Sequence, residues 1–222
     1  MDARHKAGMT HFGEIAMLKM WGRNTSSNVQ KVMWAIGEMK LPHERIDVGG
    51  AFGRTKEPFY LAMNPNSLVP TLEEEDGFSL WESNSVVRYL AGKHGGLEPK
   101  DARTRAKAHQ WMDWQLSVMG PAITPVFWGL IRTPPEKRDP AAIDAGKEKT
   151  TAACRILDEQ LGKTRFVAGD DFSYGDIPVG VMTRRYMELV PERPKLPNLE
   201  RWYAEVAARP AFKEHCGGIP LT

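Results

Sequence analysis

The stretch NPNSLVPTLEEEDGFSLWESNSVVRYLAGKH, residues 64–94, decides how the rest of the chain is placed. Apolar and polar residues alternate over 71–73 and again over 78–81, with the turn pair Asp76-Gly77 between them, which is typical of a β-hairpin. A helix is predicted directly afterwards, from Glu82-Ser83 to the stop signal Gly95-Gly96. Its apolar residues recur at the spacing of one helix face, at Val86, Val87, Leu90 and Ala91.

Pro70 opens the first strand of this hairpin, where a missing N–H is tolerated. We expect the Val69-Pro70 bond to be cis, which would turn the Val69 backbone toward a ligand. Glu82 and Ser83 place a carboxylate and a hydroxyl at a helix N-terminus beside that backbone, an arrangement that suits the amino-acid end of a small peptide. Simple helix capping by Glu82 and Ser83 is the alternative that these residues leave open.

These residues resemble the cis-proline, hairpin and Glu-Ser segment of the glutathione S-transferases, and the likeness extends from about Met17 to Phe212. It is strongest to bacterial theta/beta-like members of the serine or asparagine type. The resemblance implies an α/β thioredoxin-like N-terminal domain followed by an all-α helical C-terminal domain. It also implies that Val69 pairs its backbone with the cysteine of glutathione, while Glu82 and Ser83 hold the γ-glutamyl carboxylate and amine.

The order of elements along the chain agrees with that architecture. Residues 1–15 are polar and without periodicity, and we expect a flexible leader there. The pattern over 16–96 predicts the order β-α-β-(loop or α)-β-β-α, with a strand at 16–21, a helix carrying Val29, Val32, Met33, Ile36 and Met39 on one face, and a strand at 43–48. Residues 97–101, with Pro99, have linker character, and 102–222 predict helices alone.

Within the helical part, we expect one long helix from residue 102 to about 132, kinked by Gly120-Pro121 and Pro125. Three more helices are predicted: one at about 141–162, one that begins at a capping box formed by Ser173 and Asp176, and one at about 199–208. The box makes Asp176 a stability residue. The apolar residues of the first helix, at core-like spacing, either line a cleft for a second substrate or belong to the core or a dimer interface. They are Trp111, Trp114, Met119, Phe127 and Trp128.

Composition narrows the function classes. The chain has 222 residues, 41% of them apolar, and a formal charge of +2 without long single-sign blocks, so no nucleic-acid partner is predicted. No apolar run approaches the roughly 18 residues of a membrane span and no secretory signal is visible, so the predicted location is the cytoplasm. The two cysteines lack CxxC spacing and the six histidines lack metal spacing; we therefore expect no redox pair and no metal, and a buried Cys154.

The chemistry implied by the resemblance is ionisation of the glutathione thiol. A free thiol has a pKa of about 8.5, and lowering it by roughly two units requires about 2.7 kcal/mol of preference for the thiolate. A helix N-terminus supplies about 0.3–1 kcal/mol, and one charge-assisted hydrogen bond of about 1.5–3 kcal/mol closes the gap. Aligning the loop with the family places Ser26 at its serine and Asn28 at its asparagine. Thr25 and Ser27 stay open as alternatives, as does a role in helix capping alone.

One position departs from the family: Leu68 stands where several relatives have a Lys or Gln for the glycine carboxylate of glutathione, and Arg54 and Lys56 are the candidate substitutes. The predicted function is transfer of glutathione sulfur to small electrophilic compounds, for example halogenated ones, with glutathione as co-substrate and a homodimer as the assembly. A glutathione-dependent disulfide reductase or peroxidase is one alternative. A non-catalytic interaction module of the same fold is the other.

Overall fold

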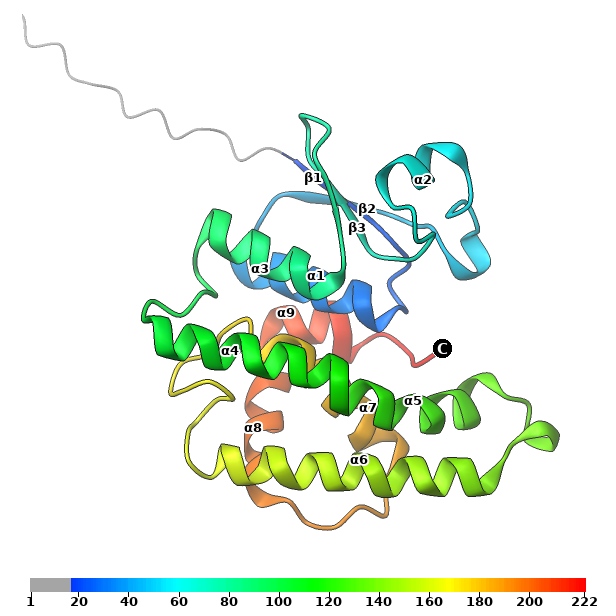
Figure 1. Cartoon of the computed structure of the whole chain (residues 1–222), viewed down its shortest axis with the longest axis vertical. Helices are drawn as coiled ribbons and strands as arrows, with labels where there is room; N and C mark the ends of the chain where they lie inside the picture. The colour runs from blue at the N-terminus through cyan, green and yellow to red at the C-terminus, as the bar shows by residue number, and fades with distance from the viewer. Residues whose placement is uncertain (1–16) are drawn as a thin grey trace, which may run out of the picture.

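The computed structural model describes residues 17–222, and its N-terminal half is built on a four-stranded sheet in the order β2-β1-β3-β4 (Figure 1). The strands are β1 (Leu18–Trp21), β2 (His43–Ile46), β3 (Thr71–Glu73) and β4 (Ser79–Trp81). β1 and β2 are parallel, while β3 is antiparallel to both β1 and β4. The predicted hairpin and crossover are confirmed; the proposed leader 1–15 and residue 16 of the predicted first strand lie outside the described residues.

The crossover helix α1 (Ser27–Met39) and the helix α3 (Ser83–His94) lie on the side of the sheet that faces the helical half (Figure 1). Four of the five residues predicted for the apolar face of α1 are buried, and Met39 is half-buried at its end. The segment left open as loop or helix contains a 3-10 turn, Gly50–Phe52, and the short helix α2 (Pro58–Met63). Pro58 suits the first turn of α2, because its missing N–H has no partner there in any helix.

The predicted kinked helix of the C-terminal half is one run of helical backbone interrupted by two π-helical segments. It consists of α4 (Ala102–Trp114), a π segment η2 (Gln115–Met119), α5 (Gly120–Phe127) and a second π segment η3 (Trp128–Arg132). The π segments flank the part that contains Pro121 and Pro125, which cannot donate to the usual helical ladder. η2 carries Gln115, which accepts a hydrogen bond from Lys31 of α1 at 2.7 Å, and its residues Gln115 and Leu116 line the wider groove described below.

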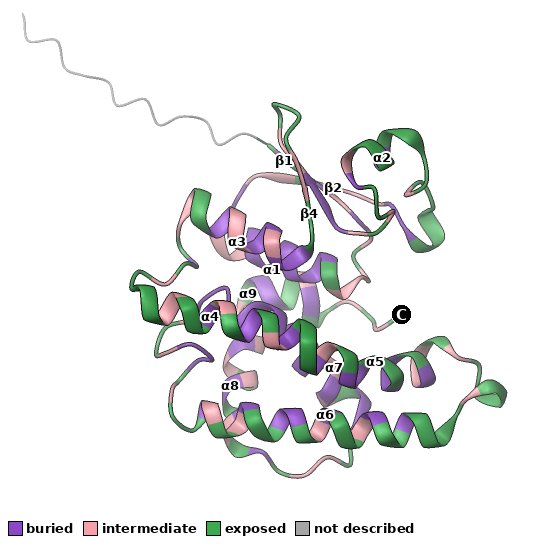
Figure 2. Ribbon diagram, viewed as in Figure 1, coloured by how far each residue is buried: buried purple, intermediate pink, exposed green. Residues whose placement is uncertain are grey.

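The remaining helices enclose a mostly apolar core (Figure 2). They are α6 (Pro140–Leu161), α7 (Asp176–Leu189), α8 (Pro197–Ala207) and α9 (Pro210–Phe212), with a 3-10 turn at Pro135–Lys137 and a π segment at Lys213–Gly217. Cys154 is fully buried, as predicted. Of the residues expected to face inward on α8, Trp202 and Val206 are buried, whereas Tyr203 is only half-buried. No helix within 17–222 combines the length and apolar character that a membrane crossing needs.

Asp176 has the stabilising role predicted for it. Its buried carboxylate accepts hydrogen bonds from the main-chain N–H groups of Val167 and Ser173, both at 3.0 Å, and from Trp202 Nε1 at 2.9 Å. Burial raises the pKa of Asp176 to about 6, although the hydrogen bonds from these three donors act to lower it. One side chain thus ties the start of α7 to the preceding loop and to α8.

The two halves share a packed interface along α1. Trp34 is fully buried, with its ring centroid 4.8 Å from that of Phe212, and an added Cβ at Gly180 of α7 would meet the Trp34 ring at 2.9 Å. Glu38 pairs with Arg209 at 2.6 Å on the same side of the helix. The C-terminal part of α1 is therefore tightly packed between the halves. The N-terminal end of α1 contributes to the pocket described below.

Candidate active site

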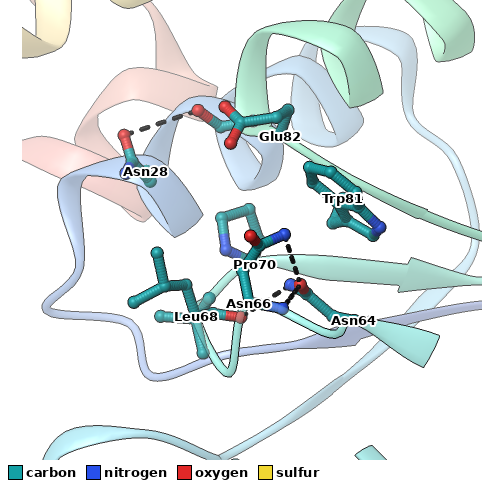
Figure 3. A pocket seen from close by; sticks show the side chains of 9 residues that line it. Asn28, Asn64, Asn66, Leu68, Pro70, Trp81 and Glu82 are labelled. Atoms are coloured by element: carbon teal, nitrogen blue, oxygen red, sulfur yellow. Dashed lines mark hydrogen bonds between the residues drawn. The ribbon is translucent and has the colours of Figure 1, made fainter. Parts of the chain in front are cut away.

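A small pocket opens where the N-terminal ends of α1 and α3 meet the loop before β3 (Figure 3). In Figure 3, Asn28 and Glu82 lie on one side of it, while Asn64, Asn66 and Leu68 lie on the other. The full lining is Asn28, Asn64, Asn66, Leu68, Val69, Pro70, Trp81, Glu82 and Ser83. Three segments that are distant in the sequence thus contribute to a single small polar pocket.

Two side chains, from α2 and the residue that follows it, hold the loop before β3 in place by hydrogen bonds. Tyr60 Oη donates to the carbonyl oxygen of Leu68 at 2.7 Å, and Asn64 Nδ2 donates to the same oxygen at 2.9 Å. Both side chains also contact Thr71 Oγ1, at 2.9 and 3.0 Å. Burial raises the pKa of Tyr60, which keeps the phenol protonated and able to donate. These bonds fix the backbone on either side of Val69.

The Val69-Pro70 peptide bond is cis, as the sequence predicted. Within residues 17–222, neither the N–H nor the carbonyl of Val69 has a hydrogen-bond partner. A backbone segment with both groups free can form hydrogen bonds with the main chain of a bound peptide.

Glu82 is held in an unusual conformation at the entrance to α3. Its φ is 70°, a value that favours glycine, and its carboxylate has no hydrogen bond or ion pair within the described part of the chain. Ser83, the first residue of α3, is buried, and its Oγ lies 3.4 Å from Asn28 Oδ1. A strained backbone that presents a free carboxylate to a pocket is a feature of binding sites, where the cost of strain is retained for function.

The loop that leads into α1 supplies the other polar groups. Ser26 is the N-cap residue of α1, but its hydroxyl makes no capping hydrogen bond. Asn28, in the first turn, is exposed and lines the pocket. No acidic residue lies in that turn, so the amide groups at the N-terminus of α1 keep their positive potential directed toward the pocket.

A second, wider groove adjoins the first, and Asn28 lines both. Its other lining residues come from α1, η2, α5 and α7 and are Ser27, Lys31, Gln115, Leu116, Gly120, Pro121, Thr124, Pro125, Met182 and Arg185. Lys31 is fully buried at its base and donates to Gln115 Oε1 at 2.7 Å. Burial, followed by repulsion from Arg185, lowers the pKa of Lys31 to about 7.

The structure brings together four of the seven predicted site residues, namely Asn28, Val69, Glu82 and Ser83. Ser26 adjoins them at the start of α1 without lining the pocket. Arg54 and Lys56 are exposed and line neither cavity, and Arg54 lies 3.6 Å from Glu57. Their predicted contact with the glycine carboxylate is therefore not visible in this arrangement.

Several lining residues were missed by sequence reasoning. Asn64 and Asn66 flank Pro65 in a turn, and that turn signal was available. Lys31 follows Asn28 by three residues, the spacing of neighbours on a helix surface, so its proximity was predictable but its burial was not. Gln115 and Arg185 reach the groove only through the packing of the two halves.

The five apolar residues of this helical run, which were predicted either for a cleft or for the core or a dimer interface, differ in their burial. Trp111, Met119 and Phe127 are buried in the core, and none of the five residues lines the wider groove. Trp128 is 57% exposed, which leaves it available as a surface contact. The same helical run does line the groove, but with Gln115, Leu116 and its prolines rather than with its aromatic residues.

Comparison with known proteins places both halves of the chain. Residues 25–93 match the family model "Glutathione S-transferase, N-terminal domain", and residues 119–210 match "Glutathione S-transferase, C-terminal domain". The chain is 41% identical over 201 residues to glutathione S-transferase GstB of Escherichia coli K12, an alignment that covers 89% of this chain and 97% of that protein. It is 29% identical to glutathione S-transferase 3 of Zea mays over 217 residues, 93% of this chain and 96% of that protein.

Among solved structures, the chain is similar to a theta class glutathione S-transferase of Xanthomonas axonopodis pv. citri with glutathione bound. The TM-score is 0.89 and the identity 39%, with 93% of this chain and 100% of the other covered. The similarity thus extends over both halves of the chain.

Proposed function

The chain belongs to the glutathione S-transferase family, and from that premise we propose that its smaller pocket binds glutathione and that its wider groove receives the electrophile. The observation that supports this most directly is the meeting of three unpaired groups in one pocket: the free Val69 backbone, the Glu82 carboxylate and the N-terminus of α1. Each of these suits a different part of one tripeptide.

The γ-glutamyl end of glutathione carries an ammonium and a carboxylate. The Glu82 carboxylate is placed to accept from the ammonium, while the hydroxyl and N–H of Ser83, at the start of α3, are placed to donate to the carboxylate. The N–H and carbonyl of Val69 pair with the cysteine residue in the manner of an added strand. Arg54 and Lys56 stay our predicted contacts for the glycine carboxylate, which requires the segment from Gly50 to α2 to bring them inward.

The cysteine thiol then lies toward the start of α1, where Ser26 and Asn28 are the proposed hydrogen-bond donors. Ser26 suits the role because its hydroxyl is not used to cap the helix, and Asn28 because it lines both cavities. Donors of this kind stabilise the thiolate over the thiol and lower its pKa. The thiolate attacks an electrophilic carbon in the wider groove, a C–S bond forms, and the leaving group departs with its electron pair.

Two further parts of the proposal concern the setting of the enzyme. We expect a homodimer in which the N-terminal half of one chain packs on the helical half of the other. We also expect the cytoplasm as its location, because glutathione is kept reduced there.

The test combines binding with turnover. Calorimetric titration with glutathione should show binding, and a panel of a haloaromatic compound, haloacids and a mixed disulfide should show conjugation of at least one halogenated compound. Binding without turnover of any compound would support an interaction module instead. Turnover of the disulfide alone would support the reductase alternative.

A further inference from the structure

The wider groove contains two cations that lack anionic partners. Lys31 is fully buried, and its one hydrogen bond within residues 17–222 is to the neutral amide of Gln115. Arg185 has no hydrogen bond or ion pair in that same range, and its guanidinium carbon lies 3.9 Å from the centroid of the Phe127 ring. Buried charges are usually paired with an opposite charge, so two unpaired cations beside one groove call for an explanation.

The surroundings increase the positive potential rather than cancel it. Repulsion from Arg132 and Arg184 adds to burial in lowering the pKa of Arg185 to about 10. Arg132 also lies near the Phe127 ring, with its guanidinium carbon 5.7 Å from the ring centroid, and donates to the main-chain oxygen of Thr222. Glu82 is the acid whose charge acts on Lys31, and it faces the glutathione pocket.

We propose that the wider groove selects electrophiles that carry an anionic group, a carboxylate above all, held by Lys31 and Arg185. This inference rests on the proposed function and specifies its second substrate. Asn28 lines both cavities and Lys31 follows it by about one helical turn, so an anion held by Lys31 would lie in the wider groove, next to the proposed thiolate.

The reaction for the simplest such substrate is a substitution. The thiolate of glutathione attacks the methylene carbon of chloroacetate, the C–S bond forms as the C–Cl bond breaks, and chloride leaves with the bonding electrons. No oxidant or reductant is needed. In water, repulsion between two anions makes chloroacetate a poorer partner for a thiolate than the neutral chloroacetamide. Lys31 and Arg185 would reverse this order of reactivity in the groove.

The test compares chloroacetate with chloroacetamide at pH 6.5, each corrected for its uncatalysed reaction with glutathione. The two compounds share size and leaving group, and differ in charge. The rate enhancement for the carboxylate should exceed that for the amide by about 10- to 100-fold, the range expected for one charge-assisted hydrogen bond. Lys31→Met and Arg185→Met should each reduce this preference by about tenfold, whereas Lys149→Met, an exposed lysine of α6, should leave it unchanged.

A binding measurement on the unaltered enzyme tests the same preference without depending on whether any variant folds. S-carboxymethylglutathione should bind at least tenfold more tightly than S-carbamoylmethylglutathione in calorimetry at the same pH. Turnover of chloroacetamide with no preference for the carboxylate, in rate or in binding, would overturn the inference and leave the proposed function in place. No turnover of either compound and no binding of either product would overturn both.

Discussion

Replacing Glu82 by glycine should affect stability and glutathione binding in opposite directions. Glu82 is held at a φ of 70°, and a non-glycine residue in such a region costs about 1–3 kcal/mol. Glycine removes that strain but gives the unfolded chain more conformational freedom, worth about 0.5–1 kcal/mol. The difference predicts that Glu82→Gly raises the free energy of unfolding by about 0.5–2 kcal/mol when glutathione is absent.

Binding should weaken in the same variant, because the carboxylate that accepts from the glutathione ammonium is gone. Loss of one charge-assisted hydrogen bond costs about 1.5–3 kcal/mol, which corresponds to a 10- to 150-fold weaker Kd. Urea unfolding without ligand measures the first quantity, and calorimetric titration measures the second. Glu82→Ala and Glu82→Gln are the matched controls, since both retain a side chain at the strained position while removing the charge.

The controls should lose binding without gaining stability. If Glu82→Gly were less stable than Glu82→Ala, the strain assigned to this position would be wrong. If Glu82→Gln bound glutathione as tightly as the natural enzyme, the carboxylate would have no role in recognition, and the Glu82 side chain would serve the fold alone.

Three other outcomes are expected. Asp176→Ala should lower the free energy of unfolding by about 3 kcal/mol or more in urea titrations, because it leaves three buried donors, Trp202 Nε1 among them, without an acceptor, whereas the exposed Asp171→Ala should change it by less than about 0.5 kcal/mol. Lys31, with its pKa lowered to about 7 by burial and by Arg185, is charged below pH 7 and neutral above it, so the ratio of kcat/KM for chloroacetate to that for chloroacetamide should be highest below pH 7 and fall above it; a ratio that is flat from pH 6 to 8.5 would contradict this. Sedimentation at micromolar concentration should give a species of twice the 25.0 kDa chain mass, and a 25.0 kDa species would argue against the dimer.

The fold was predictable because local signals and long-range packing agree in this chain. The alternation on both sides of Asp76-Gly77 and the periodic apolar residues of α1 and α3 each specify one element, and these elements combine in only a few ways. The local patterns did not predict the type of helix on either side of the proline-containing α5. The π segments lie on either side of α5, which contains Pro121 and Pro125, and the sequence indicated only a kink there.

The site was predictable where its residues lie in one ordered motif. Val69, Glu82 and Ser83 fall within fifteen residues of each other in the sequence and meet in the pocket. The wider groove was not predictable, because it is made by four elements from both halves. Nothing local distinguishes Arg185 from an ordinary surface arginine, and only the packing of α7 against α1 brings it near Lys31.

The central claim is that the start of α1 converts bound glutathione to its thiolate, and the ultraviolet absorbance of the bound thiolate against pH tests it most directly. The natural enzyme should titrate bound glutathione with a thiol pKa roughly two units below the free value of about 8.5. Ser26→Ala or Asn28→Ala should raise that pKa by about one to two units and lower turnover at neutral pH by about 10- to 100-fold, with recovery at alkaline pH. A titration that is the same in the natural enzyme and both variants would contradict the account and assign these residues to the helix end alone.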